Sequence, residues 1–81
     1  MLAPSLALPR LGPLLSSPDV MTRVRASYVL QNIVTAMPGE DWPARWRDLG
    51  SYVATSTDDN ARERDAEMWR AWIAARSGAG A

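Results

Sequence analysis

Cysteine, histidine, lysine and phenylalanine are all absent from this chain of 81 residues. The lack of cysteine excludes disulfides and thiolate metal sites, and the lack of histidine removes the commonest general base and metal ligand. A serine or threonine nucleophile needs an adjacent base, and no His, Lys or Cys is present to supply one. We therefore expect a protein that is not an enzyme, with no catalytic residues, no bound metal, no cofactor and no small-molecule substrate.

An excess of positive charge is also missing. Nine arginines are balanced by nine aspartates and glutamates, which gives a formal net charge of zero. Proteins that bind nucleic acid by neutralising phosphates usually carry a positive excess. Because this chain has none, nucleic acid is only the alternative partner. Binding would need two helices to align their arginines into one stripe. The arginines that could contact DNA in this way are Arg45, Arg47, Arg62 and Arg64.

Long hydrophobic runs are absent as well. No stretch approaches the ~20 apolar residues that a membrane-spanning helix needs. The N-terminus is rich in leucine, but it has no early positive charge and is interrupted by Pro4, Pro9 and Pro13. A secretory signal has an unbroken apolar region after a basic start. We therefore expect a cytoplasmic protein with no membrane contact.

Residues 1–16 combine leucines with prolines. Each proline removes a backbone donor and biases the preceding residue toward extended geometry, so we predict an extended arm. The arm could pack its leucines on the domain's own helices, or it could lay them on another protein. In the second case the partner-binding leucines are Leu6, Leu8, Leu11, Leu14 and Leu15.

The rest of the chain has the apolar periodicity of helices. Ser17 and Pro18 suit the start of a first helix, and Pro38-Gly39 suits its end. The predicted helices cover residues 17–37, 41–54 and 57–77. We therefore expect an all-α fold, divided into an extended Pro/Leu-rich arm over residues 1–16, a small three-helix domain over 17–77 and a disordered tail over 78–81.

Four tryptophans are many for a chain of this length. Trp42 and Trp46 lie one helical turn apart, and Trp69 and Trp72 form a second pair. In one interpretation the pairs face each other in the core and supply the bulk that phenylalanine would give. In the other, Trp69-Arg70-Ala71-Trp72 and Trp46-Arg47 lie on the surface and contact a partner, because Trp and Arg are enriched at interface hot spots. Both interpretations hold together if one tryptophan of each pair is buried and the other is exposed. The residues predicted to form the core are Tyr28, Leu30, Ile33, Trp42, Trp46, Leu49, Met68 and Trp72.

Residues 37–46 (MPGEDWPARW), running on to Leu49-Gly50, place a Pro-Gly turn before a helix with two tryptophans four residues apart. This segment resembles a stretch near the N-terminus of some actinobacterial tyrosine recombinases and phage integrases. That family's catalytic domain is separate and needs a histidine, so the resemblance implies a DNA-associated accessory module or a truncated segment. Residues 14–30 also resemble the turn and inner helix of a single HEAT-like repeat.

These observations lead to two hypotheses about function. The first is a small, non-catalytic interaction protein, bacterial or from a phage, that docks on a larger protein through its leucine arm and its Trp/Arg faces. A homo-oligomer would use the same surfaces. The alternative is a DNA-associated helical accessory module or a truncated recombinase-like segment, which would connect the chain to DNA integration.

Overall fold

The computed structural model describes the backbone of residues 4–77 and the side chains of residues 7–76. Within these residues there is no strand, and the all-α prediction is confirmed. None of the described helices is both long and apolar enough to cross a membrane. The predicted tail at 78–81 and the side chain of Leu6 lie outside what is described. The helices are α1 (Pro4–Leu14), α2 (Val20–Ala36), α3 (Trp42–Asp48) and α4 (Asp59–Ser77).

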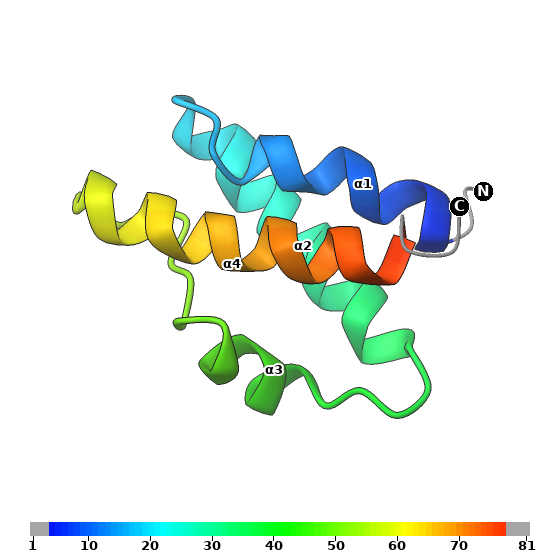
Figure 1. Ribbon diagram of the computed structural model, residues 1–81. Coiled ribbons are helices and arrows are strands. Elements are labelled where there is room, and N and C mark those ends of the chain that lie inside the picture. Colours follow the sequence, from blue (N-terminus) through cyan, green and yellow to red (C-terminus); the bar gives the residue numbers. More distant parts are fainter. Residues whose placement is uncertain (1–3, 78–81) are drawn as a thin grey trace.

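The helices form two layers around one core, with overall extents of 33 × 24 × 20 Å. α1 and α4 lie side by side in one layer, and α2 crosses behind them (Figure 1). The short α3 lies beyond α4 and is joined to its neighbours by two loops (Figure 1). α1 contacts both α2 and α4, whereas α3 contacts α2. The segment predicted to be an arm is therefore part of the helix packing.

The structure corrects the predictions of an extended arm and of three helices. Pro9 and Pro13 lie inside α1, four residues apart and both exposed, so the lost hydrogen bonds fall on the solvent side. The opposite side buries Leu8, Leu11 and Leu15. Burying a leucine contributes ~1.5–3 kcal/mol, and three of them offset the ~3 kcal/mol that each internal proline costs a helix. Four helices therefore form instead of three.

Capping explains where α2 starts and ends. Asp19, not the predicted Ser17, is the N-cap residue, and its carboxylate accepts hydrogen bonds from the backbone N–H (3.0 Å) and hydroxyl (2.6 Å) of Thr22. The helix ends at Ala36, just before the Pro38-Gly39 turn that was expected to stop it.

The core draws on α1, α2, α4 and the loop between α3 and α4, while α3 contributes no fully buried residue. Three of the predicted core residues are not part of the core: Tyr28 is 65% exposed, and Trp46 and Met68 are half-buried outside it. Trp72 packs against the core but is only half-buried, and the fully buried tryptophan of α4 is Trp69. The buried residues of α4 are Ala66, Trp69 and Ile73, at spacings of three and four. The buried face of α4 is therefore one residue further along the helix than the face of Met68 and Trp72 that was predicted. The buried apolar residues are Leu8, Leu11, Leu15, Ala26, Leu30, Val34, Tyr52, Ala54, Ala66, Trp69 and Ile73.

Side-chain hydrogen bonds fix the loop between α3 and α4. Arg23 of α2 is 6% exposed, and its guanidinium donates to the carbonyl oxygens of Ala54 (2.9 Å) and Ser17 (2.7 Å). The hydroxyl of Tyr52 donates to the carbonyl oxygen of Leu15 at 2.7 Å. A buried guanidinium must have its donors satisfied, so these bonds tie the loop to the ends of α1 and α2.

Gly50 ends α3 with φ +94° and packs closely against α4. A Cβ at this position would lie 2.6 Å from Met68 Cε and would overlap Asp65 Oδ1. Gly39 also has a positive φ of +80°, but nothing lies within 4 Å of the Cβ that it lacks.

We predict that Gly50→Ala lowers the free energy of unfolding by about 1–2 kcal/mol, because the backbone strain at a positive φ is joined only by the cost of displacing the ends of the Met68 and Asp65 side chains, which can move. Gly39→Ala is the matched control and should cost only about 1 kcal/mol, since it meets the strain alone. Urea denaturation of both variants measures the difference. Equal losses would show that the Met68 and Asp65 side chains move away from the added Cβ at no cost.

Candidate functional site

Three tryptophans form a continuous row at the centre of the domain. Trp69 of α4 is completely buried. The ring of Trp42 from α3 stacks on it with centroids 5.6 Å apart and an angle of 24°, and Trp72 meets its edge at 5.4 Å and 80°. Offset-stacked and edge-to-face pairs are the favoured aromatic geometries. The row joins α3 to α4 and forms one wall of a pocket.

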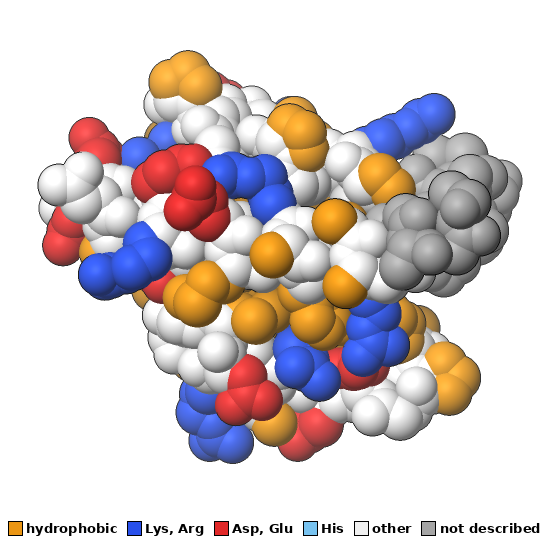
Figure 2. Space-filling model, viewed as in Figure 1, with side chains coloured by type: hydrophobic (Ala, Val, Ile, Leu, Met, Phe, Trp, Pro, Cys, Tyr) orange, Lys and Arg blue, Asp and Glu red, His pale blue; other side chains and the backbone are white. Residues whose placement is uncertain are grey.

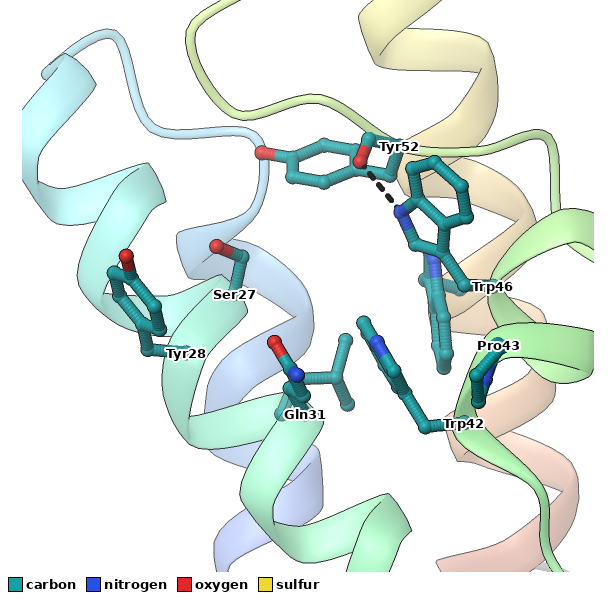
Figure 3. Close-up of a pocket in the computed structure, with 9 residues that line it drawn as sticks. Ser27, Tyr28, Gln31, Trp42, Pro43, Trp46 and Tyr52 are labelled. Atoms are coloured by element: carbon teal, nitrogen blue, oxygen red, sulfur yellow. Dashed lines mark hydrogen bonds between the residues drawn. The ribbon is translucent and has the colours of Figure 1, made fainter.

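The pocket opens between α2 and α3 and has a volume of about 350 Å³. Gln31 of α2 lies across the opening from Trp42 and Pro43 of α3, with Tyr28 further out on α2 (Figure 3). Trp46 donates its indole N–H to the carbonyl oxygen of Tyr52 at 2.9 Å, which fixes both residues on the pocket wall (Figure 3). The lining residues are Ser27, Tyr28, Leu30, Gln31, Trp42, Pro43, Trp46, Tyr52 and Trp69.

The lining of this pocket contains no charged residue. Its polar atoms are few, and some are already engaged: the Ser27 hydroxyl donates to the carbonyl oxygen of Val24 at 2.9 Å. The indole N–H of Trp69 has no acceptor, and it is the one buried side-chain nitrogen or oxygen without a partner in the described part of the chain. Leaving a buried donor unpaired costs ~1–3 kcal/mol. The pocket is therefore aromatic and neutral, and one of its lining residues, Trp69, has a buried donor without a partner.

A charged cluster covers the other end of the tryptophan row. The guanidinium carbons of Arg45 and Arg76 lie 5.6 and 4.8 Å from the centroid of Trp72, within the range of cation–π attraction. The carboxylate of Glu40, whose side chain is 5% exposed, accepts from both arginines, at 3.0 Å from Arg45 Nε. The hydrogen bond from Arg45 lowers the pKa of Glu40, and the charges of Arg45 and Arg76 lower it further against the effect of burial.

A second charged cluster joins the end of α1 to α4. Arg70 Nη2 lies 2.8 Å from Glu63 Oε1, and Arg70 Nη1 donates to the Ser16 hydroxyl. The hydrogen bond from Arg70 is the main cause of the lowered pKa of Glu63. The aliphatic part of Arg70 also lies over Gly12, where an added Cβ would be 3.2 Å from Arg70 Cγ. Arg70 therefore has a structural place between two helices of its own domain.

Most of the described residues that were predicted to bind a partner are buried inside the domain. Leu8, Leu11 and Leu15 are buried in the core, whereas Leu14 is 41% exposed; Leu6 lies outside the described side chains. The buried leucines cannot reach a partner while α1 stays packed. Trp69 is also buried and cannot reach a partner. Arg70 is paired with Glu63 of its own domain.

The predicted DNA-contacting arginines do not form one stripe. Arg45 is held by Glu40, and Arg62 pairs with Asp59 at 2.8 Å; Arg47 and Arg64 are exposed. On the face shown in Figure 2, basic and acidic side chains are interspersed over α3 and α4. No group of three acidic, histidine or cysteine side chains that could hold a metal occurs in the described part of the chain.

Comparison of the chain with protein-family models, with curated proteins and with solved structures finds no match. The site therefore has to be interpreted from its own geometry. Sequence reasoning missed the pocket because its walls come from α2, α3, α4 and a loop, which only the tertiary packing brings together. The one usable signal was the pair Trp42 and Trp46, which was assigned to the core.

We predict that Glu40→Gln destabilises the domain by about 1–2 kcal/mol at neutral pH, because two arginines lose a charged acceptor. The pKa of Glu40 is lowered by folding, so its contribution is present above the unfolded-state value of about 4.3 and disappears as the pH falls through the folded-state value. The difference between wild type and variant, measured by urea denaturation, should therefore vanish in acid.

The matched control for this variant is Asp48→Asn. Asp48 lies 3.9 Å from Arg45, but its side chain is 68% exposed, so its pairing is screened and the variant should change stability by less than about 0.5 kcal/mol. If the loss at Glu40→Gln stays the same from neutral to acid pH, the carboxylate charge is not what stabilises the cluster.

Proposed function

We propose that this chain is a non-catalytic interaction module that binds a partner protein by taking an uncharged aromatic side chain into the pocket between α2 and α3. The observation that carries the proposal is the lining itself: tryptophan, tyrosine and proline side chains with no charge among them. Aromatic residues dominate the energetics of interfaces because they bury a large apolar area and keep a polar edge.

The size of the pocket supports a side chain as the occupant. At about 350 Å³ it lies near the lower end of ligand sites, which range over ~300–1,000 Å³. We propose that the occupant also supplies an oxygen acceptor to Trp69, which lines the pocket and whose buried indole N–H has no partner. A tyrosine side chain has the right combination of a flat apolar ring and a terminal hydroxyl.

Exposed apolar residues continue the surface beyond the pocket. On α2, Met21 is 53% exposed, Tyr28 65% and Val29 43%. Tyr28 lies on the rim of the pocket, whereas Met21 and Val29 lie elsewhere on the exposed side of α2. Exposed apolar residues on a helix that borders an aromatic pocket are typical of a protein-binding surface. The interface that we propose therefore uses α2 and the pocket, in place of the leucines that α1 buries.

The DNA-associated alternative has less physical support. Two of its four arginines are occupied by acidic partners, and the net charge of the chain is zero. Phosphate contacts would make binding to a DNA duplex weaken linearly in the logarithm of salt concentration. Fluorescence anisotropy across a salt series would test for this signature.

We predict that p-cresol, which is the side chain of tyrosine as a free molecule, binds in the pocket. Saturation-transfer NMR at micromolar protein should detect it, with the aromatic protons of p-cresol receiving saturation from the protein. Pro43→Asp should weaken binding by at least about tenfold, because it removes an apolar wall and places a charge at the opening. Pro43 is exposed and lies in the first turn of α3, where an acid is favourable, so this variant should stay folded.

Ala71→Asp is the matched control, since it adds the same charge on an exposed position of α4 that does not line the pocket. It should bind p-cresol as the wild type does. Absence of saturation transfer to p-cresol in wild type, or equal binding by the two aspartate variants, would contradict the proposed function.

A further inference from the structure

Helix α3 supplies three residues of the pocket wall, Trp42, Pro43 and Trp46, although its own burial does little to hold it in place. It has seven residues, which is too short for a helix to be stable alone, and it is the one described helix without a fully buried residue. Two loops join it to α2 and α4 (Figure 1). The shape of the pocket therefore depends on the side chains that keep α3 docked.

Glu40, on the turn that leads into α3, connects this helix to α4. Its Oε1 accepts a hydrogen bond from Arg45 Nε of α3 at 3.0 Å, and its Oε2 accepts one from Arg76 Nη2 of α4. The side chain of Glu40 is 5% exposed. Moving α3 away from α4 would leave this buried carboxylate without one of its two partners, which is unfavourable. We call Glu40, Arg45 and Arg76 the clasp.

The clasp is connected to the pocket in two ways. Trp72, over which both arginines lie, meets the edge of Trp69, and Trp69 stacks on Trp42 at the pocket wall. Arg45 also follows Trp42 by three residues, a spacing that places two side chains on the same side of a helix. No residue of the clasp lines the pocket, so the clasp would act on an occupant through the position of α3 and not by contact.

We propose that Glu40, Arg45 and Arg76 are positioning residues of the pocket: they hold α3 against α4 and thereby keep Trp42 where an aromatic occupant needs it. This inference rests on the proposed function for the nature of the occupant. When the clasp is broken, the fraction of molecules with a formed pocket falls, and the apparent affinity for the occupant falls by the same factor.

Titration of the full chain with p-cresol, followed by NMR, tests the effect of the clasp on the pocket. Arg76→Glu places a second carboxylate beside Glu40, so the two should repel and the affinity for p-cresol should fall by at least about threefold. Arg76→Lys keeps a positive charge beside Glu40 and over the Trp72 ring, and its affinity should stay within about twofold of that of the wild type.

Two control variants separate the clasp from general effects. Arg47→Glu makes the same charge reversal in the last turn of α3 as Arg76→Glu makes in the last turn of α4, so both meet the same end of a helix dipole. Arg47 is exposed and does not line the pocket. Leu8→Val removes one buried methylene from α1, which contacts α2 and α4, and so lowers stability away from the clasp. Both controls should bind p-cresol as the wild type does.

Hydrogen exchange, measured by NMR at neutral pH, tests the positioning of α3 without any ligand. The backbone N–H of Leu49 donates to the carbonyl oxygen of Arg45 at 3.1 Å and reports on the integrity of α3. In Arg76→Glu this amide should exchange at least about tenfold faster than in the wild type, because α3 opens locally. Leu8→Val destabilises the core and not the local docking of α3, so it should leave the exchange of the Leu49 amide unchanged.

These measurements judge the two proposals separately. If the wild type binds p-cresol and Arg76→Glu binds it equally well, the inference is overturned and the proposed function stands. Equal acceleration of the Leu49 amide in Arg76→Glu and Leu8→Val would also overturn the inference, because the clasp would then stabilise the whole domain and not α3 in particular. If the wild type does not bind p-cresol, the proposed function fails, and the positioning of α3 by the clasp is judged by hydrogen exchange alone.

Discussion

Burying an indole ring in a domain of this size requires apolar surface from almost every element around it. Trp69 is completely buried, with Trp42 of α3 on its face and Trp72 on its edge. α1 supplies the leucines that close the core of which Trp69 is part. The leucines of α1 belong to the same core cluster as Trp69, and Trp42 of α3 covers its face, so the packing around this one side chain helps to place both helices.

α3 is too short and too exposed to hold its own position by burial alone. The loop that follows it supplies what the helix lacks, because Tyr52 and Ala54 are buried and their neighbourhood is hydrogen-bonded to α1 and α2. Arg23 is the residue that links these parts, since its guanidinium bridges backbone carbonyls from two separate segments. A polar network thereby fixes the wall of an apolar pocket.

The fold class could be predicted from the sequence because helix signals are local. The end of α2 before Pro38-Gly39 and the extent of α4 follow from such signals. The state of residues 4–14 could not be predicted in this way, because the penalty of Pro9 and Pro13 is local whereas the gain from burying leucines depends on α2 and α4. Tertiary packing decided against the local preference.

The candidate site was harder to predict for the same reason. Trp69 and Trp72 lie only about 60° apart around the axis of α4, at 3.6 residues per turn, and apolar periodicity does not resolve which of them is fully buried when tryptophan, alanine and methionine alternate. Tyr28 was expected in the core because an apolar stripe on α2 included it, yet the buried positions are Ala26, Leu30 and Val34. The pocket exists only because four separated segments, α2, α3, the loop that follows α3 and α4, meet.

The stacked pair of Trp42 and Trp69 has an optical consequence. Two indole rings with centroids 5.6 Å apart and nearly parallel planes share their electronic excitations, and their ultraviolet circular dichroism splits into paired bands of opposite sign. One ring belongs to α3 and the other to α4, so the amplitude of this splitting depends on how closely the two helices stay docked. The domain thus contains a built-in reporter of the wall of its own pocket, which can be monitored without attaching any label.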